Sequence, residues 1–133
     1  MDKVNVVAVF DPKCEKVLMC YRRKNPYKGL YNLVGGKLEK DEEAFHAASR
    51  ELEEETSITS KQIELHHLMD FVYHFSSIEV QVFYGVLNEM LEVYGEENDL
   101  IWMSLNEDFF DCHKFAGKGN IGHMMIHILS LIK

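Results

Sequence analysis

Apolar runs and turn-forming residues alternate in the first quarter of the chain. Residues 4–10 and 17–21 are mostly apolar and β-branched, and a polar stretch beginning at Asp11-Pro12 separates them. This pattern is typical of two strands joined by a turn. Residues 25–36 hold one proline and three glycines, which predicts a loop with a brief extended piece around Leu33 and Val34.

The rest of the chain contains two helical patterns and three strand patterns. Residues 41–56 lack Gly and Pro and are rich in Ala, Glu and Leu, which predicts a helix of about four turns. Residues 63–75 and 78–87 are β-prone and flank Ser76-Ser77, as in an antiparallel hairpin. After an acidic loop at 95–99, residues 100–103 predict a short strand. Residues 120–132 predict an amphipathic helix from Ile121, Met124, Ile128 and Leu131. Together these elements predict an α/β class with a mixed sheet.

Composition narrows the class of protein. A chain of 133 residues with 47% hydrophobic residues and no linker or repeat is expected to form a single domain, residues 1–133. The chain has three cysteines, Cys14, Cys20 and Cys112, which is an odd number and not at the spacing of zinc ligands. Because no signal peptide is recognised either, we expect a cytoplasmic protein without disulfides. A formal net charge of −8 argues against binding to a nucleic acid polymer or an anionic membrane. The negative charge still permits a small anionic ligand that is bound through a metal ion.

Most of the negative charge lies in one segment. Residues 39–55 hold eight acidic and two basic residues, a net charge of −6. On a helix, Glu51, Glu54 and Glu55 share a sector of about 100° with three alanines, whereas Glu53 points away. With no base expected in that sector, the like charges repel one another.

Two interpretations account for this sector. It could be a solvated acidic face, which is the usual fate of a charge run. Alternatively, the three carboxylates and a carbonyl of the preceding Gly35-Gly36 pair form an all-oxygen site for Mg²⁺ or Mn²⁺. The alanines and the glycine pair favour the metal site, because both permit close approach of backbone.

The segment from Gly36 to Ile58 resembles the Nudix box. Gly36, Glu42 and the run Arg50-Glu51-Leu52-Glu53-Glu54-Glu55 stand at the spacings of that motif, and eight of its nine specified positions match. The exception is Ser57, which stands where the family has glycine. A serine in the left-handed conformation at the end of a helix costs about 1 kcal/mol.

The resemblance implies an α/β/α sandwich with a mixed β-sheet and the hydrolysis of a nucleoside diphosphate linked to another group. It implies that Glu51, Glu54, Glu55 and the carbonyl of Gly35 bind Mg²⁺ or Mn²⁺. Glu42 would pair with Arg50 and, with Gly36, have a structural role. The reaction is substitution by water at phosphorus, in which the cations offset developing charge.

Outside the box, the chain is most similar to the MutT branch, which hydrolyses oxidised purine nucleoside triphosphates to monophosphate and pyrophosphate. The similarity rests on residues 102–105, Trp-Met-Ser-Leu. It implies that Glu96 is a further metal-binding and catalytic carboxylate, with Glu97 as the adjacent alternative. Arg23 would contact the α-phosphate.

Two further residues are candidates for binding the base. Asn120 resembles the Asn that reads the base in the MutT branch, and its amide can both donate to and accept from a purine edge. It could instead cap the last helix. Leu33 could line a base pocket or pack beneath the loop, and the two arginines at 22 and 23 could be plain surface charges.

The expected activity is thus a Mg²⁺-dependent nucleotide pyrophosphohydrolase whose partner is a small-molecule nucleotide. Two alternatives remain at the level of sequence. One is a Nudix hydrolase of ADP-ribose, a nucleotide sugar or a dinucleoside polyphosphate. The other is a Nudix domain that senses nucleotides without catalysis.

Overall fold

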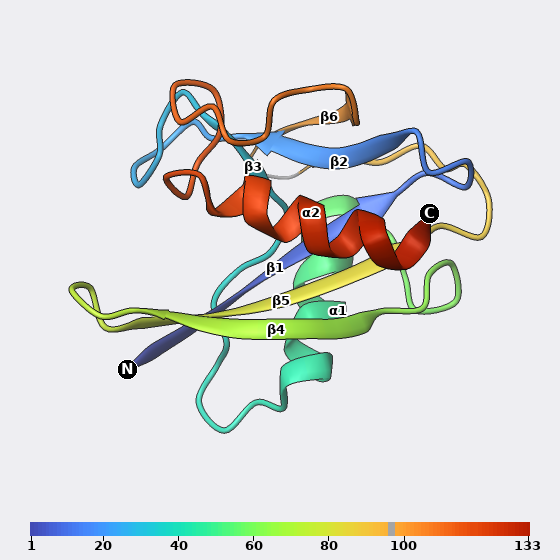
Figure 1. Ribbon diagram of the computed structural model, residues 1–133. Helices are drawn as coiled ribbons and strands as arrows, with labels where there is room; N and C mark the ends of the chain where they lie inside the picture. Colours follow the sequence, from blue (N-terminus) through green and yellow to red (C-terminus); the bar gives the residue numbers. More distant parts are fainter. Residues whose placement is uncertain (96–97) are drawn as a thin grey trace.

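The computed structural model describes residues 1–95 and 98–133, which form a sheet with a helix on each side (Figure 1). The elements follow the chain in the order β1 (Asp2–Phe10), β2 (Lys16–Tyr21), β3 (Tyr31–Leu33), α1 (Ala44–Thr56), β4 (His66–Tyr73), β5 (Ile78–Val86), β6 (Asp99–Ser104) and α2 (Asn120–Ile132). Strands appear at every run where the sequence predicted one.

The sheet is mixed, as the sequence predicted. β1 and β5 run parallel in register from Asp2 opposite Ile78 to Phe10 opposite Val86. The other pairs, β1–β2, β2–β3, β2–β6 and β4–β5, are antiparallel. The strand order is β3-β2-β1-β5-β4, with β6 also paired to β2.

The chain that follows β3 continues along β1. The Val7 N–H donates to the Val34 carbonyl at 2.7 Å, and the Asn5 N–H donates to the Gly36 carbonyl at 2.8 Å. This pairing holds the Gly35-Gly36 turn against the middle of β1. It also leads the chain directly from the sheet toward the start of α1.

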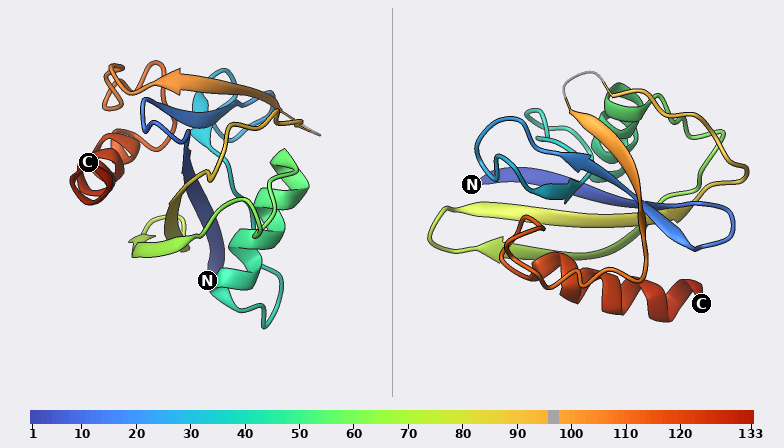
Figure 2. Two further views of the ribbon diagram at one scale, coloured as in Figure 1. Left: turned by 90° about the vertical axis from the view of Figure 1, so that its right-hand side faces the viewer. Right: turned by 90° about the horizontal axis from the view of Figure 1, so that it is seen from above.

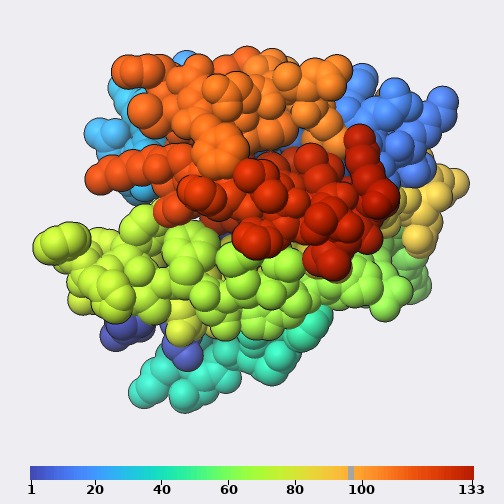
Figure 3. All heavy atoms as spheres, viewed as in Figure 1, coloured from blue at the N-terminus to red at the C-terminus, as the bar shows by residue number. Residues whose placement is uncertain are grey.

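The two helices cover opposite faces of the sheet (Figure 2). On one face, Leu52 of α1 belongs to a buried cluster with Val7 and Phe83. On the other face, α2 and the segment before it lie over the sheet beside the β4–β5 hairpin (Figure 3), and Ile128 packs in a cluster with Phe10. Because both faces are covered, Val7 to Phe10 are fully buried. Strands buried on both faces have continuous apolar runs. The expected α/β/α sandwich is confirmed.

The predicted boundaries of α1 and β4 differ from the observed ones. α1 begins at Ala44, three residues later than expected, because the Glu43 carboxylate caps the helix by accepting from the Phe45 and His46 N–H groups at 3.1 and 3.0 Å. Asp41 has a φ of 62°, which is not helical. β4 covers residues 66–73 of the predicted run 63–75 and carries an irregularity after His67.

The C-terminal end of α1 and the N-terminal end of α2 test two predictions, for Ser57 and for Asn120. Ser57 adopts the left-handed conformation with a φ of 68°, and its N–H donates to the Glu53 carbonyl at 2.9 Å. The serine therefore takes the position that the Nudix box gives to glycine. α2 begins at Asn120 as predicted, but its N-cap is Gly119 and has no side-chain capping bond. The alternative role of Asn120 as an N-cap is therefore wrong.

Within the described residues, neither helix has the length and apolar character needed to cross a lipid bilayer.

Candidate metal centre and active site

A polar cavity of about 380 Å³ lies between the Gly35-Gly36 turn, α1 and the start of β6. Four parts of the chain meet there: the end of β2, the turn after β3, the acidic side of α1 and the residues that lead into β6. Its lining residues are Arg22, Gly35, Gly36, Lys37, Glu51, Glu54, Glu55, Asn98 and Leu100. The structure thus brings the three sequence-predicted carboxylates of α1 and the glycine pair to one cavity.

The glycine pair is required by close contacts on both sides of the turn. Gly35 has a φ of 150°, and a Cβ there would lie 2.1 Å from the Asn5 carbonyl oxygen. A Cβ on Gly36 would lie 2.3 Å from the Glu51 carboxylate. The Gly35 N–H also donates to Glu55 Oε2 at 3.5 Å. The turn therefore lies directly against two of the three carboxylates.

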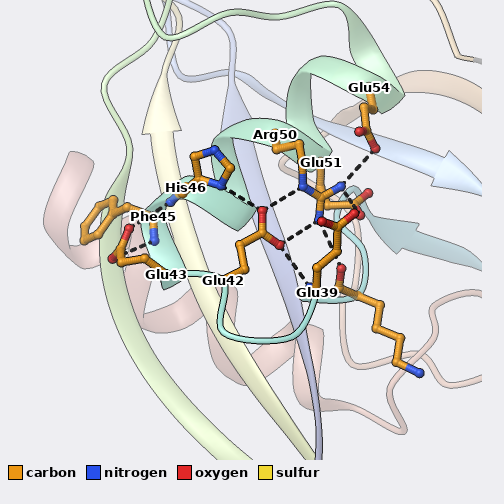
Figure 4. Close-up of polar contacts among 9 residues, drawn as sticks. Glu39, Glu42, Glu43, Phe45, His46, Arg50, Glu51 and Glu54 are labelled. Carbon is orange, nitrogen blue, oxygen red and sulfur yellow. Dashed lines mark hydrogen bonds and ion pairs between the residues drawn. The ribbon is translucent and has the colours of Figure 1, made fainter.

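Arg50 joins α1 to the loop in front of it through a fork on Glu42 (Figure 4). Its Nε donates to Glu42 Oε2 at 2.7 Å and its Nη2 to Oε1 at 2.9 Å. The Glu42 side chain is 6% exposed and also accepts from the Glu39 N–H at 3.0 Å. These contacts, with Arg50 as the largest cause, lower the pKa of Glu42 to about 2. Glu42 is therefore ionised at neutral pH and braces the loop against the helix.

The same guanidinium reaches the acidic sector of α1. Arg50 Nη1 donates to Glu51 Oε1 at 3.0 Å and to Glu54 Oε2 at 3.1 Å. The expectation that no base lies in this sector is therefore wrong, because the long arginine side chain extends across the helix surface to it. Burial is the largest influence on Glu51 and raises its pKa despite Arg50.

The donor chemistry of the cavity fits a hard divalent cation. Among residues 1–95 and 98–133, no three Asp, Glu, His or Cys side chains are gathered into a ready-made cage. However, the cavity is lined by three carboxylates of α1 and the backbone of Gly35, which are oxygen donors of the kind that Mg²⁺ and Mn²⁺ prefer. The Glu51 carboxylate lies in the space that a Cβ on Gly36 would occupy, so any other residue there would displace it.

The two arginines at the end of β2 occupy different places. Arg22 lines the cavity, and its Nε donates to the Pro26 carbonyl at 3.3 Å. Arg23, the residue suggested by the MutT resemblance, is 60% exposed and forms an ion pair with Asp99. It is not among the residues that line the cavity.

The other sequence-predicted residues lie away from the cavity lining. Leu33 is 2% exposed and packs in the core cluster on the α2 side of the sheet. Asn120 donates from Nδ2 to the Tyr73 hydroxyl at 2.5 Å. That hydroxyl donates to the Gly117 carbonyl at 3.4 Å. The predicted carboxylate Glu96 and its neighbour Glu97 lie outside the described residues.

Sequence reasoning missed several residues that line the cavity. Lys37 directly follows the glycine pair, so its position in the motif could have identified it. Asn98 and Leu100 enter the cavity because β6 pairs with β2, and this pairing has no local signal in the sequence.

Comparison with known proteins gives the family. The sequence model of the NUDIX domain matches residues 1–116. A bifunctional NMN adenylyltransferase/ADP ribose pyrophosphatase from Francisella tularensis, complexed with AMP and a Mn ion, superposes with a TM-score of 0.73 at 22% identity. The match covers 95% of this chain and 41% of that one. This chain therefore spans less than half the length of that bifunctional protein.

Two other solved structures are similar over more of their own length. A C. elegans Ap4A hydrolase has a TM-score of 0.75 at 20% identity, covering 98% of each chain. A MutT structure from work on Aliivibrio salmonicida and Vibrio cholerae has a TM-score of 0.61 at 23% identity, covering 77% of this chain and 79% of that one. At these identities the structures show a shared fold, while the domain match extends over most of the sequence. The chain therefore belongs to the NUDIX domain family of hydrolases.

Proposed function

We propose that this NUDIX hydrolase is a Mg²⁺-dependent nucleotide pyrophosphohydrolase of the MutT type. Its substrates would be nucleoside triphosphates, oxidised purine nucleotides among them, and its products the monophosphate and pyrophosphate. The observation that carries the proposal is the cavity in which Glu51, Glu54 and Glu55 face the Gly35-Gly36 turn. This cavity is lined both by acidic residues, which could ligate a cation, and by the basic residues Arg22 and Lys37.

Each part of the cavity has a distinct task in this proposal. Glu51, Glu54, Glu55 and the carbonyl of Gly35 would hold the cation, with Glu96 as a further ligand. When bound, Mg²⁺ or Mn²⁺ supplies positive charge to the phosphate oxygens and makes water a better nucleophile. The Glu42–Arg50 fork keeps Glu51 in place, because Arg50 bonds to both carboxylates. Lys37 lines the cavity and would add positive charge after leaving Asp2, whose Oδ2 lies 3.6 Å from the Lys37 Nζ.

Two arginines are candidates for contact with the α-phosphate. The resemblance to MutT favours Arg23, and the geometry favours Arg22, which lines the cavity. Arg23 would first have to leave Asp99. Replacing each in turn with Ala distinguishes them. Loss of the arginine that binds phosphate should raise KM markedly more than loss of the other.

Base recognition is proposed for Asn120, with Leu33 in a supporting role. The Asn120 amide can offer both a donor and an acceptor to a purine edge. Its bond to the Tyr73 hydroxyl holds one side of the amide. Leu33 is buried, so it would help by packing the end of β3 in place and would not contact the base itself.

A second candidate function is hydrolysis of a dinucleoside polyphosphate. The observation that favours it is the structural match to the Ap4A hydrolase, which covers 98% of both chains, whereas the MutT match covers 77% of this chain. Both functions use the same carboxylates and differ in the leaving group.

One assay decides between these functions. The purified protein is incubated with Mg²⁺ or Mn²⁺ and a panel of normal and oxidised nucleoside triphosphates, Ap4A and ADP-ribose, and the phosphate products are separated. Release of pyrophosphate and monophosphate, fastest from a purine triphosphate, is the expected result. Preferential cleavage of Ap4A would establish the second candidate, and no turnover of any compound would overturn both.

A further inference from the structure

Asn5 is a buried polar residue in β1, where the other residues from Val4 to Phe10 are apolar. It stands between Val4 and Val6 in β1 and is 2% exposed. A buried amide that lacks hydrogen bonds destabilises the folded state relative to an exposed amide. A valine would fit the pattern of the strand without that cost, so the partners of the Asn5 side chain should explain its presence.

Asn5 holds both polar backbone groups of Gly36. Its main-chain N–H donates to the Gly36 carbonyl at 2.8 Å, and its side-chain Oδ1 accepts from the Gly36 N–H at 3.1 Å. An apolar residue at position 5 would keep the first bond and lose the second. The Gly36 N–H would then lose its acceptor, and the turn would be attached to β1 less firmly.

The position of Gly36 in turn limits the position of Glu51. A Cβ at Gly36 would lie 2.3 Å from both Cδ and Oε2 of Glu51, so the carboxylate rests directly on the glycine backbone. Arg50 Nη1 holds the other oxygen, Oε1, at 3.0 Å. The carboxylate is thus held between the turn and the guanidinium, and a shift of the turn would release one side of it.

Gln81 lies next to Asn5 across the parallel pair β1–β5. The two residues are opposite each other in register, and Gln81 is 6% exposed. Its Nε2 donates to Glu79 Oε2 at 3.3 Å. Among the described residues, the buried side-chain polar atoms without a hydrogen-bond partner are Asn5 Nδ2 and Gln81 Oε1. One is a donor and the other an acceptor, and they belong to paired residues.

We propose that Asn5 is a positioning residue of the active site, whose amide oxygen fixes the Gly36 peptide and, through it, the Glu51 carboxylate. Gln81, paired with Asn5 in register, places a second buried amide opposite it in the sheet. Asn5 does not line the cavity and takes no part in the chemistry itself. Its effect on catalysis rests on the proposed function of the cavity, whereas its effect on Gly36 does not.

The test compares Asn5→Val with Val9→Ala, which removes buried volume on the same face of the same strand. Three quantities are measured: hydrogen exchange at the Gly36 amide, the affinity for Mn²⁺, and kcat and KM. Asn5→Val should speed Gly36 exchange at least tenfold relative to Val9→Ala. It should also weaken Mn²⁺ binding by about 10- to 100-fold, the usual effect of losing a group that orients a metal ligand.

A milder variant covers the case in which Asn5→Val does not fold. Gln81→Met keeps the Asn5–Gly36 bond and removes the buried amide opposite Asn5, so Gly36 exchange should rise by a smaller factor than in Asn5→Val. Exchange at Gly36 indistinguishable from that of Val9→Ala, in whichever of the two variants folds, would overturn the proposal. Because this readout needs neither metal nor substrate, a protein that hydrolyses no nucleotide would count against the proposed function alone.

Discussion

The helices α1 and α2 have the same length of 13 residues but differ in what they bury. α2 buries large side chains, Met124, Met125 and Ile128 among them. α1 buries two alanines, Leu52 and Thr56, and presents three carboxylates to a cavity. Larger buried apolar surface stabilises the folded state more. The α2 face is therefore expected to contribute more of the stability, and the α1 face carries the proposed site.

The sheet beneath the helices differs in the same way. The α2 side contains Ala8, Phe10 and Val82, all apolar and fully buried. The α1 side also has fully buried apolar residues, such as Val7 and Phe83, but it contains Asn5 and Gln81, which are buried with one unpartnered polar atom each. Proteins commonly give up some stability at functional sites, where local rules of packing are broken. The comparison indicates that mutations on the two sides should have separable effects on stability and on activity.

The largest change in stability is expected on the α2 side. Ile128→Ala should lower the free energy of unfolding by about 2–5 kcal/mol, because it opens a cavity in a fully buried site. Ile126→Ala is the matched control: Ile126 is 57% exposed on the same helix, and its effect should stay within about 0.5 kcal/mol. Urea denaturation measures both. Equal losses in the two variants would contradict the division between the helices.

The largest change in activity is expected on the α1 side. Glu54→Gln should lower kcat/KM about a hundredfold or more, since each factor of ten corresponds to about 1.4 kcal/mol of transition-state stabilisation. Its stability should change little, because the Glu54 side chain is 55% exposed. Glu53→Gln provides the control on the same helix, and its activity should match that of the unmodified protein. A Glu54→Gln variant with full activity would remove the carboxylate from the proposed site.

Glu42 should give the α1 side a distinct pH dependence. Its pKa is lowered from the ordinary 4.5 to about 2, chiefly by Arg50. A lowered pKa in the folded state stabilises the protein fully above the ordinary value, and the contribution is lost as the pH falls toward 2. The difference in melting temperature between the unmodified protein and Glu42→Gln should therefore be largest above about pH 5.

The same difference should shrink steadily as the pH falls from 4.5 toward 2. Thermal melts at a series of pH values measure it, with Glu53→Gln as the reference for loss of a carboxylate on this helix. A difference that does not change with pH would show that the ionised form of Glu42 is not what Arg50 stabilises.

The smallest effect is expected at the end of α1. Ser57 is left-handed with a φ of 68°, so Ser57→Gly should raise the free energy of unfolding by up to about 1 kcal/mol. Ser57→Ala removes the hydroxyl and keeps the backbone strain, so it should give no such gain. Activity should be unchanged in both. Chemical denaturation distinguishes the two, and a gain from Ala equal to that from Gly would refute the strain.

Elements set by local patterns could be predicted from the sequence, and pairings over long distances could not. The start and end of α2 and the carboxylates that line the cavity follow from helical spacing and the Nudix box. The start of α1 was misplaced because a glutamate, Glu43, caps it. The approach of Asn98 and Arg22 to the cavity depends on the pairing of β6 with β2, which brings together residues 76 apart in sequence.

Side-chain contacts between distant residues could not be predicted either, as Arg50 shows. Helical geometry placed it outside the acidic sector, whereas its guanidinium contacts Glu42, Glu51 and Glu54 together. Likewise, the hydrogen bond between Asn5 and Gly36 joins residues 31 positions apart, and no motif marks Asn5. Spacing along one helix predicts which residues share a face, but not which side chains meet across elements.

The most direct test is a titration with Mn²⁺, by calorimetry, of the unmodified protein and of Glu54→Gln, each with and without a non-hydrolysable nucleotide. If the acidic sector of α1 holds divalent cations, the unmodified protein takes up Mn²⁺ saturably and Glu54→Gln binds it at least about tenfold more weakly. Absence of Mn²⁺ uptake by the unmodified protein, in the presence of the nucleotide as well as in its absence, would contradict a metal-dependent site in this cavity.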